Sequence, residues 1–282
     1  MIAASFLFAC MGVCVKLGAA YFSAGELVFY RGFVAMLIVA GIVRWRGVPL
    51  RTRYAATHLR RSLAGFVSLA AYFCAITLIP LAAAVTLSYT SPLFLALLVM
   101  FWAKGEHAPS LYPSLGVGFV GVVLLLQPTI EQRQWLGGLL GLAAGVISSM
   151  AYFNLRRLGV LGEPEWRTVF YFSAFSSIGA LPWAMVAHAG KPVPTAGWLL
   201  VLGVGGFGAA AQWCMTTAYA RGRTLVTASL AYTTVVFSSL FGLLLWHERL
   251  TTMAWLGIAL IIAAGIAATR PGPPRRPAVA EL

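Results

Sequence analysis

Apolar residues fill this chain in runs about as long as a membrane is thick. A helix that crosses the hydrocarbon core of a bilayer needs about 20 mostly apolar residues. Ten such runs, separated by short polar stretches, can be marked in the 282 residues. They cover residues 2–20, 25–43, 61–79, 82–103, 111–127, 136–155, 167–188, 197–218, 225–246 and 252–269. The pattern predicts an all-α membrane protein with ten transmembrane helices.

The composition supports the membrane class. The chain is 60% hydrophobic and only 10% charged, whereas soluble domains contain roughly 25% charged residues. A water-soluble core could not bury this much apolar surface. The first residues are expected to form a true first span, because Lys16 follows the first apolar run and no basic stretch precedes it.

The basic residues are distributed unevenly between the two sides of the predicted bundle. Of the 20 Lys and Arg, 15 fall in alternate loops and in the C-terminal tail, and 3 fall on the other side. By the positive-inside rule both termini of this multi-pass protein are then cytoplasmic. The net charge of +13 is explained by this topology, and no aromatic-basic motif indicates nucleic-acid binding. The Pro-rich tail, 271–282, is predicted to be disordered and cytoplasmic.

The cysteine and glycine patterns indicate neither a cofactor nor a metal. The four cysteines lie in apolar runs without nearby ligands that would complete a metal shell. "GVGFVG" (116–121) and "GVGGFG" (203–208) match a dinucleotide fingerprint, but each lies inside an apolar span instead of following a strand. Close helix packing explains them better, and Gly137, Gly141 and Gly145 form a further ridge of small residues.

One polar-aromatic sequence motif, the repeated phrase, occurs twice in the chain. "TLSYTSPLFLALL" (86–98) and "SLAYTTVVFSSLF" (229–241) share a hydroxyl residue, Leu, Tyr-Thr, Phe and Leu at an offset of 143, and "VFY" recurs at 28–30 and 169–171. The matches are colinear and divide the chain into repeats, 1–130 and 131–270, of five spans each. Because five is odd, the second repeat enters the membrane inverted, an architecture typical of secondary transporters.

These stretches resemble the drug/metabolite transporter superfamily, in its EamA branch. The resemblance is carried by "GELVFYRG" (25–32), by 78–98 with the following Gly105-Glu106, and by 228–248. It covers nearly the whole chain. It implies a ten-span inner-membrane transporter of two five-helix repeats, which moves amino acids, nucleobase-like compounds or other small metabolites, often outward.

Polar groups inside hydrocarbon are costly, so they mark candidate pathways. Several hydroxyl, amide and aromatic residues fall on single helical faces of spans that line the cavity in the family. The predicted substrate-binding residues of this kind are Ser68, Tyr72, Thr86, Tyr89, Thr90, Ser149, Tyr152, Gln212, Trp213, Thr216, Tyr219, Ser229, Tyr232 and Thr233. Pro92 is expected to loosen the helix beside Tyr89 and Thr90. The alternative is that each Ser or Thr bonds back to its own helix or joins two helices.

Two cations, Lys16 and Arg31, complete the predicted site. Both lie within spans, and Glu26 is the one acid close to them in sequence. An excess of positive charge favours an anionic group, such as a substrate carboxylate. The alternative is that the side chains reach the interface and pair with Glu26.

The chain has no Asp, and its seven Glu and four His fall at span ends, in loops or in the tail. This argues against a proton relay through carboxylates at the midplane and leaves open a facilitator, an exchanger or coupling through an unusual group. Glu106 and Glu248 are expected to cap the helices that follow them.

The sequence therefore predicts an alternating-access transporter, and more specifically an exporter, of small amphipathic metabolites such as amino acids or their derivatives. Uptake of a carboxylate- or nucleoside-like solute and a non-transporting scaffold or sensor are the alternatives. An enzyme is not expected, because the spans contain no catalytic grouping. The partners are the solute and the lipid bilayer, and a homodimer stays open.

Overall fold

The computed structural model describes residues 1–47, 49–79, 81–102, 111–127, 135–186, 193–247 and 251–269. This part of the chain is helical and contains no strand. Its helices are α1 (Ile2–Gly18), α2 (Ala24–Arg46), α3 (Ala55–Leu78), α4 (Leu81–Ser88), α5 (Ser91–Trp102), α6 (Leu111–Leu126), α7 (Trp135–Val160), α8 (Glu165–Val186), α9 (Thr195–Arg221), α10 (Thr224–Ala231), α11 (Thr233–Trp246) and α12 (Thr252–Thr269). The predicted tail and the acids Glu106 and Glu248 lie outside the described residues.

The helices match the predicted passes in number and place. Within the described residues, six helices are long and apolar enough to cross a membrane, and two of these join α4 with α5 and α10 with α11. Three further apolar helices are shorter, and α3 accounts for the remaining pass. Large apolar side chains point outward, among them Ile178, Leu199 and Leu244, each more than 60% exposed. An exterior of this kind suits lipid, and the protein is a multi-pass helical membrane protein.

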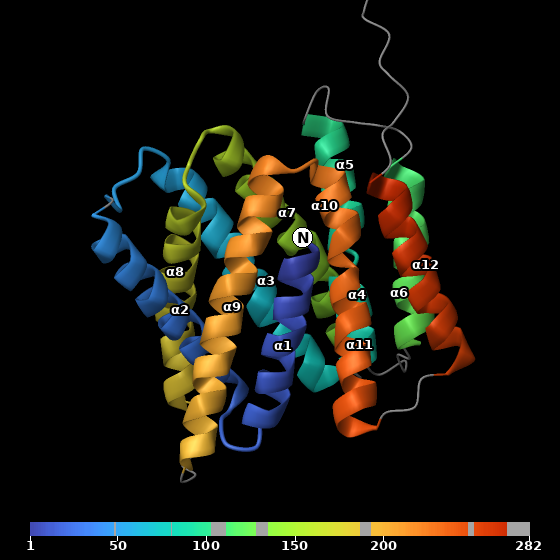
Figure 1. Ribbon diagram of the computed structural model, residues 1–282, viewed down its shortest axis with the longest axis horizontal. Coiled ribbons are helices and arrows are strands. Elements are labelled where there is room, and N and C mark those ends of the chain that lie inside the picture. Colours follow the sequence, from blue (N-terminus) through green and yellow to red (C-terminus); the bar gives the residue numbers. More distant parts are fainter. Residues whose placement is uncertain are drawn as a thin grey trace, which may run out of the picture.

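The helices run alongside one another in a bundle (Figure 1). The most extensive contacts join α3 with α7, α2 with α8, α6 with α12, and α1 with α9. Figure 1 shows α2 and α8 together at one side and α6 with α12 at the other. Every one of these pairs joins a helix before residue 130 to one after it, so the two parts of the chain are packed into one another.

Two of the passes are interrupted, and both interruptions fall at the Tyr-Thr of the repeated phrase. The first lies at Tyr89–Thr90 between α4 and α5, and the second lies at Tyr232 between α10 and α11. In both, the threonine hydroxyl donates to the carbonyl three residues earlier: Thr90 to Leu87 at 2.5 Å, and Thr233 to Leu230 at 2.7 Å. A hydroxyl that takes a backbone acceptor in this way competes with the helical ladder.

Pro92 has no backbone N–H and lies in the first turn of α5, a position that proline tolerates. The predicted loosening of the first pass is thus confirmed. The second interruption has Val235 at the position corresponding to Pro92, and the sequence did not predict it. The threonine and its bond to the carbonyl three residues earlier are the features that both interruptions share.

The glycine ridge of α7 lets neighbouring backbone approach closely. A Cβ added at Gly137 would lie 2.6 Å from Ile79, and one at Gly141 would lie 3.1 Å from Leu87. One at Gly145 would lie 2.8 Å from the Leu87 carbonyl oxygen. The prediction that these glycines serve close packing is confirmed, and the ridge seats α7 against the end of α3 and the first interruption.

The loops before α3 and before α8 meet at one end of the bundle. Glu163 accepts hydrogen bonds from His58 Nε2 at 3.0 Å and from Arg167 Nη1 at 2.9 Å, and Arg167 also donates to the Pro49 carbonyl at 2.8 Å. The segments 49–58 and 163–167 therefore lie on the same side, as the predicted topology requires.

The protonation of this end network follows from its contacts. Burial lowers the pKa of His58, which lies near the start of α3, so the ring stays neutral and donates to Glu163. Burial alone would raise the pKa of Glu163, but hydrogen bonds from His58, Arg167 and Thr52 outweigh it and hold that pKa below its usual range. The loop is thus fixed by an ionised carboxylate with three donors.

Candidate functional site

Tyrosines from both parts of the chain gather at the two interruptions. The rings of Tyr89 and Tyr232 lie 6.3 Å apart, and Tyr152 of α7 stacks on Tyr219 of α9 at 5.1 Å with planes inclined by 10°. Tyr219 and Tyr232 are fully buried, and their hydroxyls have no hydrogen-bond partner. The Tyr89 hydroxyl bonds to Thr234 of α11. We call Tyr89, Tyr152, Tyr219 and Tyr232 the tyrosine cluster.

A cavity of about 70 Å³ lies between the two interruptions and is lined by both. Tyr89 and Pro92 line it from the first interruption, Ala231 and Thr234 line it from the second, and Tyr152 lines it from α7. Pockets that enclose drug-sized ligands measure roughly 300–1,000 Å³. The helices are thus closed tightly around this space in the conformation described here.

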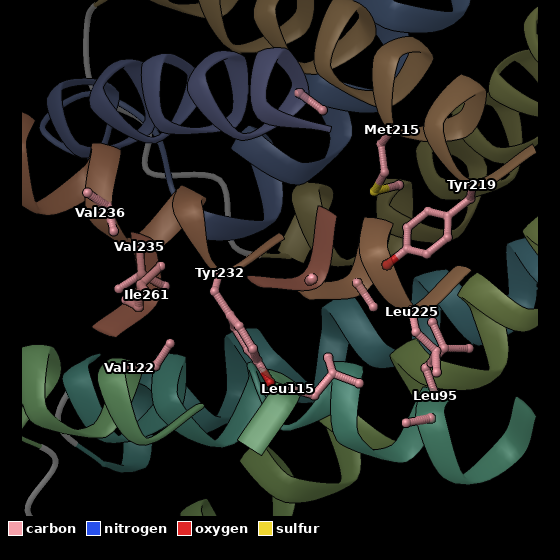
Figure 2. Packing of buried hydrophobic residues seen from close by; sticks show 14 of the residues in the cluster. Leu95, Leu115, Val122, Met215, Tyr219, Leu225, Tyr232, Val235, Val236 and Ile261 are labelled. Atoms are coloured by element: carbon pink, nitrogen blue, oxygen red, sulfur yellow. The ribbon is translucent and has the colours of Figure 1, made fainter. Parts of the chain in front are cut away.

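The ring of Tyr232 shows how the second interruption reaches across the bundle. Figure 2 shows it extending from the junction of α10 and α11 toward Leu115 of α6. Gly118 of α6 makes room for it, since a Cβ there would lie 2.7 Å from the ring. A residue larger than glycine at this position would press on the tyrosine.

Arg31 lies beside a second, smaller cavity of about 10 Å³ between α2, α8 and α9. Gln212 and Ser176 line the same cavity. The Arg31 Nε, Gln212 Nε2 and Ser176 Oγ atoms are all buried without a hydrogen-bond partner. Buried polar atoms are normally paired, so three unpaired groups that can donate around one cavity suit a ligand that accepts hydrogen bonds.

Arg61 of α3 lies against the Phe172 ring that Arg31 also approaches. Its guanidinium carbon lies 3.8 Å from the centroid of the Phe172 ring, and that of Arg31 lies 5.8 Å from the same centroid. Arg61 is only 2% exposed, and its Nε and Nη1 atoms have no partner. The Tyr152 hydroxyl interacts electrostatically with both guanidinium groups, which connects the arginines to the tyrosine cluster.

Arg61 is the site residue that the sequence interpretation missed. It was counted with the loop cations at the start of a span from residue 61, but α3 begins at Ala55, so Arg61 lies in the second turn with a buried side chain. Its position next to Arg60 made it resemble a loop residue. Removing it from the loop count does not reverse the charge bias.

Most of the predicted hydroxyl ligands are satisfied by the protein itself. Ser68 donates to the Ala144 carbonyl at 2.9 Å and contacts Ser148, so it joins α3 to α7. Ser149 and Thr216 donate to carbonyls of their own helix. Thr90 and Thr233 donate to Leu87 and Leu230 of the preceding helix, at the two interruptions. Ser229 is buried without a partner, and Thr86 is buried. Tyr72 packs on Ala75 and interacts electrostatically with Tyr89.

Of the predicted site residues, Arg31 and Gln212 line the smaller cavity and Tyr89 and Tyr152 line the larger one, whereas Lys16 and Trp213 contact other parts of the bundle. Lys16 is exposed in the last turn of α1, and its ammonium lies 3.9 Å from the ring of Trp246. Arg31 is buried beside the smaller cavity, and Glu26 caps α2 through Ser23. Trp213 packs against Val39 and Val169 between helices.

The profile of the EamA-like transporter family matches residues 1–127 and again residues 135–269. The chain belongs to the EamA-like transporter family. It is therefore a transporter of the drug/metabolite superfamily, as the sequence predicts.

EamA relatives of known name differ in solute and direction. The chain is 30% identical over 268 residues to the pseudopaline exporter CntI of Pseudomonas aeruginosa, which covers 95% of this chain and 93% of that one. It is 25% identical over 248 residues to a riboflavin transporter of Rhizobium johnstonii, covering 88% and 81%. An S-adenosylmethionine uptake transporter of Rickettsia felis is 24% identical over 241 residues, covering 85% and 80%.

The fold also agrees with a solved structure. One protein crystal structure superimposes with a TM-score of 0.84 at 22% identity, covering 95% of this chain and 96% of that one. At this identity the likeness concerns the fold alone.

Proposed function

We propose that this EamA protein is a secondary transporter of the inner membrane that exports small amphipathic metabolites, such as amino acids or their derivatives. In this proposal the halves 1–130 and 131–270 are inverted five-helix repeats, both termini are cytoplasmic, and transport proceeds by alternating access between the halves.

The helix contacts support two related halves. When α1 to α6 are matched in order with α7 to α12, exchanging the halves converts the α3–α7 contact into α9–α1 and the α5–α7 contact into α11–α1, and both members of each pair are extensive. The contacts of α2 with α8 and of α6 with α12 convert into themselves. A twofold relation between the halves accounts for this pattern, and five spans per half make that relation an inversion.

One observation carries the proposal: the two copies of the repeated phrase meet. Tyr89 and Tyr232 hold the same position in their phrases, each sits at a helix interruption, and their rings lie 6.3 Å apart beside the larger cavity. Interrupted helices at the interface of two repeats are the usual setting of a solute site in secondary transporters.

The chemistry of the two cavities suggests the solute. Arg31, with the unpaired groups of Gln212 and Ser176, favours a carboxylate. The tyrosine cluster favours an apolar or aromatic body, held by ring contacts. Export is the preferred direction, because the pseudopaline exporter matches nearly the whole chain. Uptake is the second candidate, favoured by the S-adenosylmethionine uptake relative.

Flux into proteoliposomes tests the proposal. Purified protein is reconstituted and offered a panel of radiolabelled amino acids and aromatic or acylated derivatives. We expect Tyr89→Ala and Tyr232→Ala each to reduce flux at least about tenfold, because the first removes a wall of the cavity and the second removes the repeat-related ring that lies 6.3 Å from it. Tyr54→Ala, which truncates a tyrosine at the start of α3, is the matched control and should keep wild-type flux.

Two results would count against the proposal. Wild-type flux in both cluster variants would remove these tyrosines from the site, and absence of flux across the panel would argue for a scaffold or sensor. Reconstitution in both orientations, with one orientation blocked by an impermeant reagent on an introduced loop cysteine, separates export from uptake.

A further inference from the structure

We propose that the solute carries two carboxylates, one held by Arg31 and the other by Arg61, whose guanidinium groups both lie against the ring of Phe172. This inference rests on the proposed transport function and narrows its solute class from amphipathic metabolites in general to dicarboxylic ones. It assigns a binding role to Arg61, which the sequence placed among the loop cations.

The two guanidinium groups are close enough to serve one small solute. Both lie against the Phe172 ring, at 3.8 and 5.8 Å from its centroid, so the distance between their central carbons cannot exceed the sum of these values. A short dicarboxylate, or an amino-acid derivative with two carboxyl groups, spans such a gap.

Neither arginine has an acidic partner within the described part of the chain. The acids there are Glu26, Glu163 and Glu165. Glu26 bonds to Ser23 at the start of α2, and the other two bond at the loop end of the bundle. The partners of Arg61 are the Phe172 ring and, electrostatically, the Tyr152 hydroxyl.

The two buried guanidinium charges favour a solute with two carboxylates over a solute with one. A buried cation without a counter-ion is costly, and two cations close together also repel each other. One bound carboxylate would neutralise one guanidinium and leave the second buried and unpaired. Two carboxylates neutralise both, and each can take a bidentate pair from its arginine. The site is therefore selective for the second negative charge.

Groups around Arg31 strengthen the assignment. The Gln212 Nε2 atom can only donate, and the Ser176 hydroxyl can do so, and both are buried without partners beside the same cavity as the unpaired Arg31 Nε. No carboxylate lines that cavity. The lining offers several donors to an anion and would leave a cationic group poorly satisfied.

A purely structural role for Arg61, as a cation that stacks on Phe172 to join α3 to α8, makes a different prediction. Loss of such a contact would weaken every ligand alike. Loss of a carboxylate-binding residue instead removes the preference of the protein for a diacid over its matched monoamide. The ratio of the two affinities is thus the informative measurement.

The experiment measures that ratio by calorimetry and by ligand-induced thermal shift on full-length protein in detergent. The probes are three matched pairs: N-benzoyl-glutamate with N-benzoyl-glutamine, glutamate with glutamine, and aspartate with asparagine. In wild-type protein we expect the diacid of at least one pair to bind at least about tenfold more tightly than its amide. In Arg61→Gln and in Arg31→Gln the ratio should fall toward one. Arg60→Gln, the exposed neighbour, should keep the wild-type ratio.

Three results would overturn the dicarboxylate inference. They are equal binding of acids and amides by wild-type protein, no binding of any diacid, and a preference for the diacid that survives both substitutions. Arg61→Lys serves if Arg61→Gln does not fold: it keeps the charge but loses the bidentate geometry, so the ratio should fall in part. If other solutes of the broad panel are still carried with sensitivity to Tyr89→Ala, the transport function stands although the dicarboxylate inference has failed.

Discussion

The contact between α7 and the first helix interruption can be tested with one methyl group. Gly145 lies on the buried face of α7, where an added Cβ would contact the Thr90 hydroxyl and lie 2.8 Å from the Leu87 carbonyl oxygen. These are the two groups that bond to each other at the interruption. The added methyl group of Gly145→Ala therefore presses on the first helix interruption, which lines the larger cavity.

The magnitude follows from two opposing effects. Overpacking a tight contact costs about 1–3 kcal/mol, while replacing glycine by alanine inside a helix contributes roughly 0.5–1 kcal/mol of stability. Gly206, inside α9, has no atom within 4 Å of an added Cβ, so Gly206→Ala should show the gain alone. The difference between the two variants isolates the clash at about 1–3 kcal/mol. At ~2–4 °C per kcal/mol, that is roughly 2–12 °C in Tm.

The assay is thermal unfolding of both variants in the same detergent at one scan rate, with flux measured beside it. We expect Gly145→Ala to melt below Gly206→Ala by that interval and to transport more slowly. If Gly145→Ala melts at or above Gly206→Ala, the close approach of α7 to the interruption does not exist as described, and the reasoning from it is refuted.

Three further predictions concern the ends of the bundle. The pKa values of His58 and Glu163 are both lower in the folded chain than in the unfolded chain, so the unfolded chain binds more protons. The stabilisation that these two groups contribute is complete above about pH 6.5 and is lost as the pH falls. Tm should drop between pH 7 and pH 5, and His58→Gln should reduce that drop; an equal drop in the variant would exclude His58 as its source. Ser23→Ala removes the capping box of α2 and should cost about 0.5–2 kcal/mol, measured as a lower Tm; an unchanged Tm contradicts it. Arg221→Gln breaks an ion pair with Glu165 in which the arginine is 74% exposed, so a loss of more than about 1 kcal/mol would be unexpected.

The passes were predictable from sequence because the bilayer imposes its own length on apolar runs. The glycine ridge of α7 was predictable for a similar reason, since small residues four apart share one face of a helix. The interruption at Tyr232 was not predictable by the rule that found the first one, because no proline accompanies it. The bond from the Thr233 hydroxyl to Leu230 that accompanies it depends on a rotamer that the sequence does not specify.

The candidate site was predictable in part. Tyr89 and Tyr232 were found because the phrase around them is repeated, and the structure brings them together. Trp213 shares a helix with Gln212 but faces the packing between α2 and α8, and sequence spacing alone does not say which face of a buried helix meets a cavity. Arg61 was missed because a cation next to a loop is ordinarily solvated, and only the packing of Phe172 shows that this one is enclosed.

The two cations beside Phe172 have an electrical consequence. In a cell whose cytosol is negative relative to the outside, each charge moved through 100 mV corresponds to about 2.3 kcal/mol. A cargo that departs with two negative charges would be expelled with about twice that energy, which supports a concentration ratio of roughly two-thousandfold at equilibrium. Voltage alone would then suffice to drive efflux, without a co-transported proton or sodium ion. The polarity of an imposed potassium diffusion potential would set the direction in which vesicles fill.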